Sequence, residues 1–110
     1  MQEVAPKREY LCALLDRYGS ALSGRCREVL ESYYADDLSL AEIAENTGIT
    51  RQGVRDAVKR GEAELLSLEK ALGYHEKACR AIRLAAELTE GSSDPSVKEK
   101  AAEIAALFES

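Results

Sequence analysis

Residues 39–59 read SLAEIAENTGITRQGVRDAVK. Within this stretch the small residue Ala44 is followed four positions later by Gly48. Ile49 and Val54 then supply two aliphatic side chains. Two helices that meet at about 90–120° leave no room for a large side chain at their crossing, and the turn between them favours glycine. The order of these residues therefore predicts a helix-turn-helix.

Capping signals mark where both helices of this motif begin and where the first one ends. Ser39 and Glu42 have the spacing of a capping box, in which each side chain accepts a hydrogen bond from the other residue's backbone N–H. Gly48 can adopt the left-handed backbone angles that end many helices. Thr50 is a favourable N-cap residue for the second helix. The motif is thus bounded by local chemistry alone.

The second helix presents a polar face that is suited to nucleic acid. In DNA-binding helix-turn-helix proteins the start of this helix enters the major groove. Arginine pairs with guanine and glutamine with adenine, while a helix N-terminus suits a phosphate. The alternative is a solvated face with no ligand. The predicted nucleic-acid-binding residues are Thr50, Arg51, Gln52, Arg55, Lys59 and Arg60.

The remainder of the chain predicts an all-α protein. Of its 110 residues 45% are apolar and 32% charged, which fits a folded globular domain and argues against disorder. Gly73 is a point where a long helix can bend or break. The expected parts are residues 1–61, with N-terminal helices and the helix-turn-helix unit 39–61, and residues 62–110, with a long helix 62–90 and a terminal helix 95–109.

The predicted long helix carries a heptad-like apolar seam. Its residues recur at steps of three and four, as they do where helices pair. The seam is either a dimer interface or part of the domain's own core, with the core favoured for its first three residues. Its members are Leu65, Leu68, Leu72, His75, Cys79 and Ile82, continued by Ala86 and Thr89.

Charge and cysteine content limit the classes of partner and compartment. The net charge is -5, yet residues 39–61 carry four basic side chains against three acidic ones. A single copy of the chain is therefore expected to have only a modest electrostatic affinity for phosphates. Three cysteines favour reduced thiols in a cytoplasm. No apolar run is long enough to span a membrane, and the first residues lack the pattern of a signal peptide, so no membrane insertion is expected.

Signals for catalysis or metal binding are weak. No nucleophile with a base, phosphate loop or dinucleotide motif is present, so we expect no enzyme, no cofactor and no small-molecule substrate. His75 and Cys79 have metal-ligand spacing, but they fall on an apolar stripe, which favours packing. We expect Tyr33 in the core and Tyr34 exposed, where a tyrosine can stack on RNA bases.

Three segments resemble one known family. Residues 27–34, 37–44 and 48–56 read REVLESYY, DLSLAEIA and GITRQGVRD. They are similar to the small YlxM-like proteins, which share the fold of region 4 of bacterial sigma factors and are encoded beside signal recognition particle genes. The resemblance extends over about residues 8–75, and Gly53 stands where the family more often has alanine.

This resemblance implies a sigma-region-4-like helix-turn-helix bundle with a long C-terminal helix. It implies a cytoplasmic accessory or regulatory protein of signal recognition particle-dependent targeting, which touches the particle's RNA or its GTPase and forms a homodimer. Two other functions remain open: a DNA-binding transcription regulator, and a helical adaptor that binds protein and no nucleic acid. The family's motif positions in this chain are Thr50, Arg51, Gln52, Val54 and Arg55.

Overall fold

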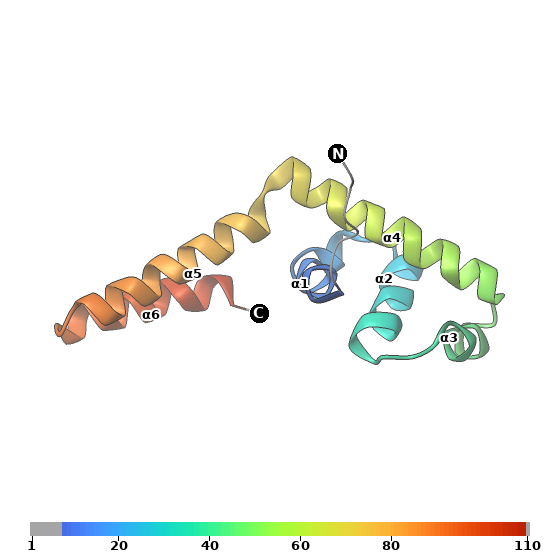
Figure 1. Ribbon diagram of the computed structural model, residues 1–110, viewed down its shortest axis with the longest axis horizontal. Helices are drawn as coiled ribbons and strands as arrows, with labels where there is room; N and C mark the ends of the chain where they lie inside the picture. The colour runs from blue at the N-terminus through green and yellow to red at the C-terminus, as the bar shows by residue number, and fades with distance from the viewer. Residues whose placement is uncertain (1–7, 110) are drawn as a thin grey trace. The chain divides into compact units, whose positions relative to one another are not determined.

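A computed structural model describes residues 8–109, and its regular elements in that range are all helical. The all-α prediction is confirmed. The chain divides between Leu72 and Gly73 into two compact units (Figure 1). No helix within residues 8–109 has the length and apolar character needed to cross a lipid bilayer.

The first unit is a bundle in which three helices lie along one side of a fourth (Figure 1). A short 3-10 helix (Gly19–Ala21) follows the first helix, and a π-helical turn (Glu31–Ala35) extends the second. The four α-helices are α1 (Arg8–Tyr18), α2 (Gly24–Leu30), α3 (Leu40–Thr47) and α4 (Arg51–Leu72).

The core of this unit forms where α1, α2 and α3 meet α4. Apolar residues at helical spacing line the inner face of each helix, and their burial stabilises the unit. Glycine 61 belongs to the same region, because α4 passes close to α2 there. The largest fully buried side chains are Leu14, Val29, Leu30, Ile43, Val54 and Leu65.

The second unit is a helical hairpin made of α5 (Tyr74–Gly91) and α6 (Pro95–Phe108). Gly73 precedes α5 with φ 62°, a left-handed conformation that ends α4. Asp94 caps α6 by accepting a hydrogen bond from the Ser96 N–H at 2.9 Å. The signals at Gly73 and Asp94 therefore separate three consecutive helices.

The structure differs from the predicted organisation at the junction of the two parts. The boundary expected between residues 61 and 62 falls inside α4, and the long helix expected over 62–90 is divided at Gly73 into α4 and α5. α1 begins at Arg8, the first residue that the structure describes. Ser23 precedes α2 in an extended backbone conformation, and its side chain makes no capping hydrogen bond.

Candidate nucleic-acid interface

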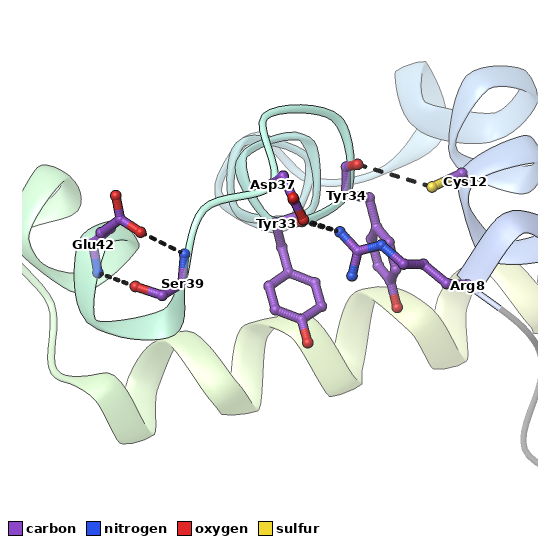
Figure 2. Close-up of polar contacts among 7 residues, drawn as sticks. All are labelled: Arg8, Cys12, Tyr33, Tyr34, Asp37, Ser39 and Glu42. Atoms are coloured by element: carbon purple, nitrogen blue, oxygen red, sulfur yellow. Dashed lines mark hydrogen bonds and ion pairs between the residues drawn. The ribbon is translucent and has the colours of Figure 1, made fainter.

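The turn between α3 and α4 is built by the capping residues that the sequence indicated. Ser39 Oγ accepts from the Glu42 N–H, and Glu42 accepts from the Ser39 N–H, each at 3.1 Å (Figure 2). Gly48 ends α3 with φ 78°. Thr50 Oγ1 accepts a hydrogen bond from the Gly53 N–H at 3.0 Å. These predictions are confirmed, and together they fix the direction in which α4 leaves the turn.

The capping box makes a pH-dependent contribution that can be measured. Hydrogen bonds from the backbone and hydroxyl of Ser39 lower the pKa of Glu42. The contribution of this carboxylate is therefore complete above its unfolded-state pKa and is lost as the pH falls through the lowered folded-state value. We expect the difference in unfolding free energy between wild type and Glu42→Gln to shrink over that acidic range in urea titrations.

Glu45→Gln is the matched control for this prediction, because it removes an equal charge from α3 and leaves the Ser39–Glu42 pair intact. If the difference from wild type shrinks as much for Glu45→Gln as for Glu42→Gln, the effect does not arise from the cap.

The first turns of α4 expose the polar residues that the sequence selected. Val54, Ala57 and Val58 are buried on the inner face and hold the helix against the core. The opposite face is open to solvent. Its exposed residues, with Thr50 just before the helix, are Thr50, Arg51, Gln52, Arg55, Lys59 and Arg60.

The cations on this face have no acidic partners inside the described protein. Within residues 8–109, no ion pair involves Arg51, Arg55 or Lys59, and Arg60 is equally unpaired. Asp56, the acidic residue among them, accepts a hydrogen bond from Gln52 Nε2 at 2.9 Å. Four positive charges therefore remain available to an external anion, while the Gln52 amide already has an internal partner.

A hollow of about 290 Å³ lies beside this basic face. Arg55 and Lys59 form part of its lining, so cations and an aromatic ring border one surface depression. The ring is that of Tyr33, which is half-buried and not part of the fully enclosed core. The complete lining is Tyr33, Leu40, Arg55, Val58, Lys59 and Glu62.

Tyr34 has a structural role in place of the exposed position expected for it. Its ring packs edge-on against Tyr33, with centroids 5.0 Å apart, and its hydroxyl donates a hydrogen bond to Glu62. Burial raises the pKa of the Tyr34 phenol above its ordinary value, and the hydrogen bond to Glu62 raises it further. Tyr34 is half-buried and committed to internal contacts, so the expectation of an exposed stacking ring is wrong.

Arg8, which lies on α1, packs against both Tyr33 and Tyr34 (Figure 2). Its guanidinium carbon lies 5.2 Å from the centroid of the Tyr33 ring and 4.8 Å from that of Tyr34. The same group donates to the Tyr33 carbonyl at 2.7 Å and to Asp37 at 3.1 Å. Sequence reasoning missed Arg8, because it lies 25 residues before Tyr33 and no local pattern connects the two.

The predicted heptad seam does not form one continuous stripe. Leu65 is enclosed in the core, and Leu68 packs partly against it, but the Leu72 side chain is 57% exposed. Beyond the break at Gly73, α5 turns different residues inward. Of the remaining predicted members, His75 and Ile82 are half-buried and Cys79 is exposed.

His75 and Cys79 are neighbours on α5. The Cys79 sulfur lies 3.6 Å from His75 Nε2. Within the described residues no three side chains of histidine, cysteine, aspartate or glutamate come together as a metal site would require.

Comparison with known proteins agrees with this geometry. The model of one family matches residues 5–105. The family is UPF0122, described as "Putative helix-turn-helix protein, YlxM / p13 like". The chain belongs to this family. The match to UPF0122 extends well past Tyr74, so the resemblance is longer than the sequence alone indicated and includes the α5–α6 hairpin.

Three UPF0122 proteins illustrate the similarity. That of Symbiobacterium thermophilum is 41% identical over 80 residues, which cover 73% of this chain and 75% of the relative. That of Clostridium botulinum is 44% identical over 73 residues, covering 66% and 67%. That of Acetivibrio thermocellus is 50% identical over 64 residues, covering 58% and 55%. The UPF0122 description favours a regulatory protein over an enzyme.

Proposed function

We propose that this protein is a cytoplasmic nucleic-acid-binding protein that uses the start of α4 as its recognition helix. The observation that carries the proposal is the exposed row of Arg51, Arg55 and Lys59, one helical turn apart and without internal ion pairs. The core holds this row rigidly, since Val54 and Val58 on the other face are buried. Fixed cations on a rigid helix are what groove recognition requires.

The proposed contacts divide by chemistry. Arg51 and Arg55 face base edges, where a guanidinium pairs bidentately with guanine. Thr50, Lys59 and Arg60 lie at positions suited to phosphate oxygens. Gln52 Nε2 donates a hydrogen bond to Asp56 at 2.9 Å. Gln52 must break this hydrogen bond before its amide can pair with an adenine. The two arginines therefore dominate recognition in this proposal.

Within this function we place the protein in signal recognition particle-dependent targeting, as an accessory factor. The support is the resemblance to YlxM-like proteins, whose genes lie beside those of the particle, together with membership of UPF0122. The proposed ligands are the particle's RNA and, through protein contacts, its GTPase. The hollow beside Arg55, with Tyr33 on its lining, suits an RNA with unpaired bases, because such bases stack on aromatic side chains.

A titration of the 110-residue chain tests this function. We expect fluorescence anisotropy to show tighter binding to the particle's RNA than to random duplex DNA. If the two phosphate-facing cations, Lys59 and Arg60, neutralise phosphates, affinity falls by about tenfold between about 50 and 200 mM salt, since each contact adds about 0.7–0.9 to the slope of log affinity against log salt.

The other functions predict different results in the same titration. A preference for duplex DNA with a sequence dependence identifies a transcription regulator and contradicts the role in targeting. Salt-independent binding to the GTPase, without affinity for either nucleic acid, contradicts nucleic-acid binding altogether and identifies an adaptor.

A further inference from the structure

The hollow beside the basic face contains one acidic side chain among its cations. Glu62 lines it together with Arg55 and Lys59. These residues are spaced by four and three positions on α4, so their side chains lie along one face of that helix. A carboxylate repels phosphate oxygens, which carry the same charge. Contact with the backbone of a nucleic acid therefore does not account for Glu62.

The Glu62 carboxylate is held in place without being neutralised. Its Oε2 accepts a hydrogen bond from the Tyr34 hydroxyl. Within residues 8–109 no ion pair joins it to Arg55 or Lys59, although all three line the same hollow. A carboxylate can accept about four hydrogen bonds, so most of the acceptor capacity of Glu62 remains. A ligand that displaces water from this half-buried group must supply donors in return.

The rest of the lining is apolar or aromatic. Leu40 and Val58 contribute aliphatic side chains, and Tyr33 contributes a ring. The guanidinium carbon of Arg8 lies 5.2 Å from the centroid of that ring, but Arg8 is not part of the lining, so a different part of the ring borders the hollow. The volume of about 290 Å³ is close to the lower limit of about 300 Å³ for ligand pockets. A small flat ring with N–H donors on its edge fits both the carboxylate and the apolar lining.

We propose that this hollow binds one unpaired guanine of an RNA strand, with Glu62 accepting hydrogen bonds from the Watson–Crick edge of the base. This inference rests on the proposed function and names the base that the site takes. Single-stranded RNA is recognised by stacking of its bases on aromatic rings and by hydrogen bonds to their edges. In a duplex the Watson–Crick edge is already paired, so only an unpaired base can present it to Glu62.

The chemistry of the four bases favours guanine. Guanine has two adjacent donors on its Watson–Crick edge, N1–H and the 2-amino group, which two carboxylate oxygens can accept together. Adenine and cytosine have one amino group there, and uracil has one N–H between two carbonyls that a carboxylate repels. Guanine also has the O6 and N7 acceptors with which arginine pairs, and Arg55 lines the same hollow. Lys59 is then left for the neighbouring phosphate.

Short RNAs that differ in one base test this assignment with the wild-type chain. The probes are oligouridines whose central base is guanine, hypoxanthine or uracil. Hypoxanthine differs from guanine only in lacking the 2-amino group. Competition against a fluorescent guanine probe at constant ionic strength measures the relative affinities. We expect the uracil probe to bind at least about tenfold more weakly than the guanine probe, with the hypoxanthine probe between them.

Glu62→Gln tests the residue that makes the distinction. Its amide oxygen can still accept from the Tyr34 hydroxyl, but its NH₂ group opposes the donors of guanine. We expect the preference for guanine over uracil to fall below about threefold, with unchanged helical circular dichroism. Glu64→Gln is the matched control, because it removes the same charge from α4 at a position outside the lining. We expect it to keep the wild-type preference.

The possible results separate this inference from the proposed function. Equal binding of the guanine and uracil probes, equal binding of the guanine and hypoxanthine probes, or an unchanged preference in Glu62→Gln overturns the guanine site and leaves nucleic-acid binding by α4 standing. Binding to the particle's RNA or to duplex DNA, with no affinity for any of the oligouridines, does the same. A chain that binds none of these nucleic acids removes the proposed function and the guanine site with it.

Discussion

Arg51→Ala combined with Arg55→Ala is expected to weaken nucleic-acid binding by a factor of about 100 or more. Both side chains are exposed at the start of α4, one turn apart, and neither has an ion-pair partner within the described residues. A bidentate contact is worth about 1–3 kcal/mol, and about 1.4 kcal/mol corresponds to a tenfold change in affinity. Anisotropy titrations at constant ionic strength measure the loss.

Arg80→Ala combined with Arg83→Ala is the matched control, because both arginines are exposed on α5 and the change in net charge is identical. We expect this variant to bind within about a factor of three of wild type. An equal loss in the two double variants shows that only total charge matters, which contradicts a recognition role for α4.

A charge-conserving variant separates the two kinds of contact that arginine makes. Lysine keeps the positive charge but loses the planar fork that pairs with guanine. Arg51→Lys combined with Arg55→Lys is therefore expected to retain the salt dependence of binding and to lose sequence or structure preference. Full retention of preference shows that the arginines contact phosphates alone.

The turn at the centre of the fold was predictable because its determinants are local. A capping box needs only Ser39 and Glu42, three residues apart, and the left-handed turn needs only a residue without a Cβ at position 48. Both features are complete within ten residues of sequence. For the same reason the exposure of Arg51 and Arg55 followed from the buried positions of Val54 and Val58.

The continuity of α4 through residues 61 and 62 was not predictable, because glycine has different roles that only tertiary packing distinguishes. Gly53 and Gly61 lie inside α4, whereas Gly73 ends it in a left-handed conformation. In sequence these three glycines look alike. Gly61 differs from the other two because Leu30 of α2 lies close to it. Leu30 is 31 positions earlier in the chain, so no local pattern indicates this contact. An expected boundary at 61 and 62 therefore fell inside a continuous helix.

The residues around the candidate interface show the same division between local and distant determinants. The tyrosine pair is visible in the sequence, but its orientation depends on Arg8 from α1 and on Glu62 from α4. Those contacts turn Tyr34 inward and leave Tyr33 to line the hollow. In the hairpin, small alanines form the buried stripe, so the larger apolar residues that hydropathy selects lie outside it.

Gly61→Val is expected to lower the free energy of unfolding of the first unit by about 2–3 kcal/mol. A Cβ at this position would lie 2.6 Å from Leu30 Cδ1 and 3.0 Å from its Cγ. Leu30 is fully buried within the core cluster, so any shift of its side chain disturbs the packing of its neighbours. Overpacking of a filled core costs about 1–3 kcal/mol, and the small helix-propensity gain over glycine does not offset it.

Urea unfolding followed by tyrosine fluorescence measures this loss in the first unit. Gly24→Val is the matched control, since no atom lies within 4 Å of a Cβ built there, and we expect a change of no more than about 0.5 kcal/mol. Leu30→Ala alone is expected to cost about 2–5 kcal/mol. Combined with Gly61→Val it should cost less than the sum, because the valine occupies the space that the leucine vacates; strict additivity would show that Gly61 and Leu30 are not in contact.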